Sequence, residues 1–159
     1  LALPSSGVDA IRSFDLHSIQ TLVFIENKTN YDEFILSELR PGMLAVYHGG
    51  FLSPQKRKFL KKMASQLQSQ TEAVFWADID LGGFQMFERL KAIFPTLTPM
   101  RMSAEDVIAH HEAGLVRSAH YLETVQAALA SGQYPAFHRA MEKILEYGVT
   151  IEQEVFLTA

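Results

Sequence analysis

The sequence contains no cysteine, which removes several kinds of chemistry at once. Disulfide bonds, catalysis by a thiol and zinc sites built from cysteine are all excluded. No apolar run approaches the roughly 20 residues that a membrane-spanning helix needs, and no secretory signal sequence is visible. We therefore expect a cytoplasmic protein with no membrane partner.

An excess of basic residues is also missing, since the formal net charge is −4. A free-standing nucleic-acid-binding protein is usually basic overall, so the charge argues against that class. It leaves open an enzyme that contacts nucleic acid through one local patch. With 48% hydrophobic residues in 159, the chain can build one substantial core.

Strand and helix patterns alternate in the first half of the chain. The apolar runs TLVFI, MLAVY and AVFWA predict strands, and LTPMRM predicts a short fourth strand. Helices are expected after a cap at Asn30, after Ser53-Pro54, and over residues 84–94. This order predicts an α/β fold in which a parallel sheet of about four strands is flanked by helices.

From residue 103 onward the patterns indicate helices only. Ser103 with Asp106, and Thr150 with Gln153, have the spacing of capping boxes. Residues 103–159 are therefore expected to form a helical C-terminal extension that packs on the sheet or continues the domain. The expected helices lie near residues 104–114, 118–131, 135–147 and 151–158.

Three acidic residues follow two of the apolar strands. Glu26 comes directly after TLVFI, and Asp78 and Asp80 follow AVFWA. The carboxyl ends of parallel strands form the crevice where ligands bind, and residues two apart in an extended segment point to the same side. Three converging carboxylates repel one another unless a cation neutralises them, and oxygen ligands suit Mg²⁺ or Mn²⁺. The alternative interpretation of Asp-x-Asp is an exposed turn.

A glycine pair and a basic helix lie at the same edge of the expected sheet. Gly49 and Gly50 follow the second strand, where glycines permit either a close approach to phosphate or simply a tight turn. His48 is a candidate phosphate contact, although a lone histidine is more often structural. Lys56 and Arg57, closest to this loop in a basic cluster, are candidates for binding a phosphate backbone.

The segments FIEN, YHGGFLSPQKRKFL and FWADIDLGGFQMFERL together resemble the Toprim domain, in the version found in topoisomerase VI A subunits and in the Wadjet JetD nuclease family. The resemblance covers roughly residues 20–102. It implies a Rossmann-like Toprim fold with Glu26, Asp78 and Asp80 as catalytic and metal-binding residues. IEQEVF is similar to an acidic motif of the topoisomerase VI type, which implies a possible site role for Glu152 and Glu154.

The resemblance also implies a function, a domain plan and partners. The function is metal-dependent cleavage of double-stranded DNA, as the plasmid-cutting subunit of a bacterial Wadjet-type defence system. Residues 1–19 would be a linker from a preceding region, 20–102 the Toprim domain, and 103–159 the extension. The expected partners are DNA, a second copy of the chain in a homodimer, and the SMC-like subunits of the defence complex.

Two other functions remain open at this point. One is a phosphatase that uses Asp-x-Asp as nucleophile and acid, although that type places its pair after the first strand. The other is a non-catalytic Toprim-like module for dimerisation or complex assembly, which the acidic charge and the helical extension favour.

Overall fold

The computed structural model describes residue 8 and residues 11–157, and contains a parallel sheet of four strands. The strands are β1 (Thr21–Ile25), β2 (Met43–Tyr47), β3 (Glu72–Trp76) and β4 (Thr98–Pro99), in the order β2-β1-β3-β4. β1 is therefore paired on both sides, with β2 and with β3. The α/β fold expected from the sequence is confirmed, and β4 is shorter than LTPMRM suggested.

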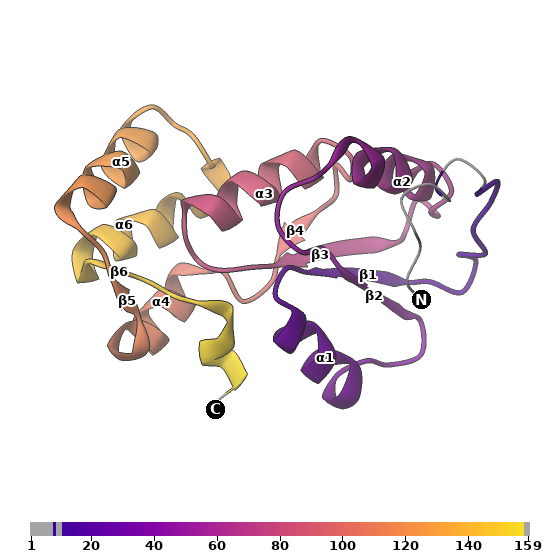
Figure 1. Ribbon diagram of the computed structural model, residues 1–159, viewed down its shortest axis with the longest axis horizontal. Helices are drawn as coiled ribbons and strands as arrows, with labels where there is room; N and C mark the ends of the chain where they lie inside the picture. The colour runs from indigo at the N-terminus through magenta and orange to yellow at the C-terminus, as the bar shows by residue number, and fades with distance from the viewer. Residues whose placement is uncertain (1–7, 9–10, 158–159) are drawn as a thin grey trace.

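Helices cover both faces of the sheet (Figure 1). α1 (Lys28–Ser37) lies on one face, and α2 (Pro54–Ala64) and α3 (Leu81–Lys91) lie on the other. This is the arrangement that right-handed connections between parallel strands produce. The consequence for function is that the carboxyl ends of β1, β2 and β3 share one edge of the sheet.

The helix starts follow the side chains that can accept hydrogen bonds from the first turn. Ser53 caps α2 by accepting from the backbone N–H of Lys56 at 3.2 Å, as expected. The cap predicted at Asn30 is wrong, because the α1 cap is Asn27, which accepts from the N–H groups of Thr29 and Asn30. Asn30 instead lies inside the helix and is fully buried.

The third helix begins three residues earlier than the expected start at residue 84. Asp80 caps it by accepting from the N–H of Gly83 at 2.8 Å, so Leu81, Gly82 and Gly83 form its first turn. An added Cβ on Gly83 would lie 2.1 Å from the carbonyl oxygen of Asp78. Glycine at this position therefore permits the helix to start directly against the Asp78 backbone.

Most of the second half is helical, as predicted. The capping box of Ser103 and Asp106 is present. The observed elements are α4 (Ala104–His110), η2 (His111–Ala113), α5 (Ala119–Ala130), η3 (Pro135–Phe137) and α6 (His138–Tyr147).

The end of the chain differs from the prediction. The helix expected over residues 151–158 and its cap at Thr150 are wrong, because Thr150 belongs to β6 (Val149–Thr150), which pairs with β5 (Leu115–Val116). Ile151 then forms a bridge with Ile79, and only a 3₁₀ helix, η4 (Gln153–Leu157), follows. Pairing with the loop after β3 has replaced the local helix.

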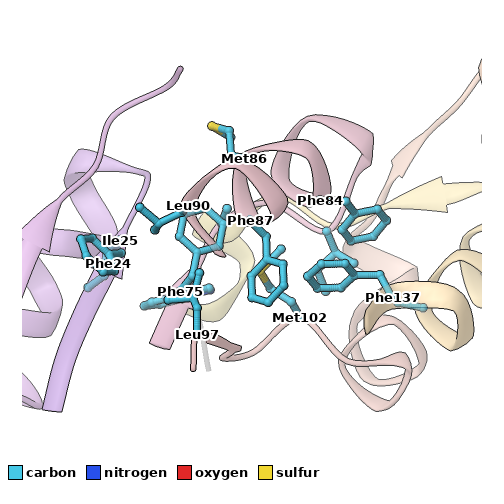
Figure 2. Close-up of a cluster of buried hydrophobic side chains, with 14 of the residues drawn as sticks. Phe24, Ile25, Phe75, Phe84, Met86, Phe87, Leu90, Leu97, Met102 and Phe137 are labelled. Atoms are coloured by element: carbon cyan, nitrogen blue, oxygen red, sulfur yellow. The ribbon is translucent and has the colours of Figure 1, made fainter. Parts of the chain in front are cut away.

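The second half shares the core of the sheet domain (Figure 2). Phe137 from η3 stacks on Phe84 of α3 with ring centroids 4.3 Å apart, and its edge meets Phe87 at 4.9 Å. The boundary predicted at residue 102 stays a prediction. Within the described residues, no helix is long and apolar enough to cross a membrane.

Candidate functional site

β1 lies between the two strands whose loops carry the other candidate residues. Ile25, its last residue, is in register with Tyr47 of β2 and with Trp76 of β3. The hydrogen-bond ladder continues past the strand ends, since the N–H of Glu26 donates to the carbonyl of Trp76 at 3.0 Å and that of His48 to the carbonyl of Ile25 at 2.7 Å. Glu26 therefore stands between the acidic loop after β3 and the glycine loop after β2.

The acidic side chains affect one another electrostatically. Burial, with Asp78 and Asp80 next in importance, raises the pKa of Glu26 from 4.5 to about 7. Burial also raises the pKa of Asp78 from 3.8 to about 6, with further contributions from Asp80, Glu154 and Glu152. The structure thus brings the three carboxylates that the sequence singled out to one edge of the sheet, in a place where ionisation of Glu26 and Asp78 is costly.

Asp80 has both carboxylate oxygens occupied. Oδ1 caps α3 at Gly83, and Oδ2 lies 3.6 Å from a terminal nitrogen of Arg117. The Arg117 side chain is held over the ring of Tyr121, 4.9 Å from its centroid, and its Nε donates to Oγ1 of Thr150 at 2.6 Å. A guanidinium from the second half of the chain therefore partly compensates this corner of the acidic site.

The C-terminal segment closes the other side of the acidic site. The backbone N–H of Gln153 donates to Oδ1 of Asp78 at 2.7 Å, and the side chain of Asn27 donates to Oε1 of Glu154. Residues 152–154 thus lie beside Asp78, which agrees with the electrostatic effect of Glu152 and Glu154 on it.

No local pattern predicted a site role for Gln153, Asn27 or Arg117, and the spacing of Gln153 from Thr150 indicated only a helix cap. Their contacts at the site depend on pairing between distant segments.

The carboxylate oxygens of Glu26, Asp78 and Asp80 are of the kind and charge that hard divalent cations such as Mg²⁺ and Mn²⁺ bind. These side chains are not arranged for coordination, because in the described part of the chain no group of three His, Asp or Glu side chains is close enough to hold a metal ion. Asp80, engaged by Gly83 and Arg117, accounts for part of this spacing. Binding a cation would require side chains to turn toward it.

The glycine loop is held by its own neighbours. Gly49 and Gly50 both have positive φ, 52° and 55°, which glycine adopts without strain. The ammonium group of Lys56 donates to the carbonyls of His48 and Gly49 at 2.9 and 2.6 Å. These contacts explain the glycines and Lys56 as parts of a tight turn, and their phosphate-binding role stays a prediction.

His48 and Arg57 differ sharply in exposure. The His48 ring is 3% exposed, and no described residue is a hydrogen-bond partner of either ring nitrogen. Burial, and secondarily Lys56, lowers its pKa to about 4, so the ring is neutral near pH 7. A phosphate could reach it only if the loop opened, whereas Arg57 is exposed on α2 and accessible. Both contacts stay predictions.

Comparison with known proteins identifies the family. The family model of the Wadjet protein JetD, C-terminal, matches residues 7–158. The chain belongs to this family. The Wadjet protein JetD of Bacillus cereus (strain Q1) is 29% identical to it over 140 residues, which are 87% of this chain and 34% of that protein. The chain thus spans about a third of the length of this curated relative.

Proposed function

We propose that this JetD C-terminal region is a Toprim-like, metal-dependent nuclease domain that hydrolyses phosphodiester bonds of double-stranded DNA. In the full protein it would be the plasmid-cleaving subunit of a Wadjet-type defence system, acting as a homodimer with SMC-like subunits. The observation that carries the proposal is the set of half-buried carboxylates at the ends of β1 and β3, two of which have raised pKa values.

Asp78, Asp80 and Glu26 would hold the metal. A bound Mg²⁺ or Mn²⁺ would neutralise charge on the scissile phosphate and on the leaving oxygen. Glu26, whose pKa of about 7 in the metal-free protein lies near neutral pH, can exchange a proton there, so it is either a metal ligand or a general base for the attacking water. Arg57, exposed at the first turns of α2, would contact the DNA backbone without reading its sequence.

Asp78→Asn tests this assignment in the full-length protein with its defence-complex subunits. The amide keeps an oxygen that can accept from the Gln153 N–H but removes the charge. We expect plasmid cleavage in Mg²⁺ to fall by at least about a thousandfold, because a bound metal supplies several kcal/mol of transition-state stabilisation. The matched control is Asp32→Asn, on the exposed face of α1 and paired with Lys28, which should cleave normally.

Cleavage by Asp78→Asn at the wild-type rate would contradict the proposal. The same protein incubated with p-nitrophenyl phosphate tests the phosphatase alternative, which predicts turnover of this ester and no cutting of supercoiled plasmid.

A non-catalytic assembly module is the second candidate. It is favoured by the spacing of the carboxylates, because within the described residues no three His, Asp or Glu side chains are close enough to hold a metal ion. This alternative predicts that neither Mg²⁺ nor Mn²⁺ supports cleavage by the complete complex, and that Asp78→Asn leaves complex assembly unchanged. Metal-dependent cleavage lost in Asp78→Asn would exclude it.

A further inference from the structure

Gln153 is fully buried although its side chain is polar. Its Oε1 accepts from the backbone N–H of Asn27 at 2.9 Å, and its Nε2 donates to the carbonyl of Trp76 at 3.3 Å. Asn27 follows Glu26 after β1, and Trp76 ends β3. One side chain thus spans the ends of the two strands that carry the acidic residues.

The backbone of Gln153 makes two further contacts. Its carbonyl accepts from Nδ2 of Asn30 at 2.7 Å, which ties the segment to α1. Its N–H donates to Oδ1 of Asp78 at 2.7 Å. Oδ1 of Asp78 is thereby held by the backbone of η4.

We propose that Gln153 is a positioning residue for the acidic site. Its side-chain amide fixes η4 across the ends of β1 and β3, and this placement sets the backbone N–H that orients the Asp78 carboxylate. The inference rests on the proposed metal-binding function and goes beyond it by assigning the orientation of one ligand to a residue outside the ligand set.

The bonds of Gln153 distinguish positioning from simple stabilisation. They end at Asn27, next to Glu26, at Trp76, two residues before Asp78, and at the Asp78 carboxylate itself. Groups that orient metal ligands from outside the ligand set change metal affinity by about 10- to 100-fold when removed. A residue that only stabilises the fold would lower the unfolding temperature and leave the affinity of the folded protein unchanged.

Gln153→Met keeps the length of the side chain and removes both amide hydrogen bonds. In the full-length protein, titration with Mn²⁺ followed by electron paramagnetic resonance should show the dissociation constant rising by at least about tenfold. The matched control, Gln126→Met, changes an exposed glutamine of α5 and should bind Mn²⁺ as the wild type does. An unchanged dissociation constant in Gln153→Met, whatever its unfolding temperature, would overturn the proposal.

A crystal structure of metal-free, full-length Gln153→Met separates this inference from the proposed function. The Asp78 carboxylate should turn away from the Gln153 N–H, and an unchanged carboxylate would overturn the positioning role. Failure of the wild type to bind Mn²⁺ would instead defeat the proposed metal function, and the Asp78 orientation would still decide the role of Gln153.

Asn30→Leu provides a milder perturbation should Gln153→Met fail to fold. It removes only the bond from Asn30 to the Gln153 carbonyl and leaves the amide contacts in place. Its Mn²⁺ dissociation constant should rise beyond that of Gln126→Met, and its Asp78 carboxylate should shift in the crystal. Wild-type values for both measurements would count against the proposal.

Discussion

The loops that follow β2 and β3 flank the same strand, β1, and differ in how their charges are satisfied. At the glycine loop, the ammonium group of Lys56 on α2 donates hydrogen bonds to the carbonyls of His48 and Gly49. At the acidic loop, burial and then neighbouring carboxylates raise the pKa values of both Asp78 and Glu26, and the guanidinium of Arg117 lies 3.6 Å from Asp80. The carbonyls of the glycine loop are thus satisfied by contacts with α2. The acidic loop retains negative charge that packing does not require, and we therefore propose that the functional site is at the acidic loop.

Gly83, in the first turn of α3 directly after the acidic loop, and Gly50 of the glycine loop should differ most in their tolerance of a side chain. Gly83→Ala places its Cβ against the Asp78 carbonyl and should reduce the free energy of unfolding by about 3 kcal/mol, because backbone must move. Gly50→Ala meets no atom within 4 Å and should cost only about 1 to 2 kcal/mol, the strain of its positive φ. Urea denaturation measures both, and equal losses would show that the two turns are equally constrained.

The two loops should also respond to pH in opposite directions. The pKa values of Glu26 and Asp78 are raised, so the folded state takes up their protons more readily, and their stabilising contribution, present at low pH, is lost as the pH rises from about 4 to about 7. The pKa of His48 is lowered from 6.5 to about 4, so its contribution is present above pH 6.5 and is lost as the pH falls through 4. Solvent near the carboxylates screens part of their effect.

Unfolding temperatures measured in EDTA at pH 5 and pH 7 test this difference. Glu26→Gln should gain stability relative to the wild type chiefly at pH 7, because it removes a charge that is costly there. For His48→Leu, the unfolding temperature relative to the wild type should be more favourable at pH 5 than at pH 7. At pH 5 the wild type loses stability because unfolding allows the buried imidazole to take up a proton. The contrast between the loops would be contradicted if the difference in unfolding temperature between variant and wild type changed in the same direction from pH 5 to pH 7 in both variants.

Replacing Arg117 should have the smallest effect of these changes, and the quantity that it changes should be the affinity for a divalent cation. Because Arg117 competes for Asp80, Arg117→Gln should tighten Mn²⁺ binding by about threefold, the size expected for loss of one nearby screened charge. Arg139→Gln, which breaks an exposed pair with Glu105, is the matched control and should leave the affinity unchanged. Weaker binding in Arg117→Gln would mean that Arg117 organises Asp80 for the metal and does not compete with it.

The parts of this site that could be predicted from sequence are those that local patterns encode. Three strands are recognisable as continuous apolar runs, and the order of strands and helices implies a parallel sheet, so the sequence alone places Glu26, Asp78 and Asp80 at one edge of the sheet. The prediction failed at the end of the chain, where Thr150 and Gln153 have the spacing of a capping box but belong to a strand and a buried contact.

The sequence by itself therefore determined the fold class and the edge of the sheet at which the acidic residues lie, because hydrophobic periodicity and residue chemistry act over a few neighbouring positions. Only the tertiary structure decided which residues orient and compensate the carboxylates. Gln153 reaches Asp78 across 75 positions in the chain, and Arg117 reaches Asp80 from a separate part of the fold. Such contacts form when distant backbone segments pair, and pairing with Ile79 outweighed the helix that the local pattern of residues 151–158 favours.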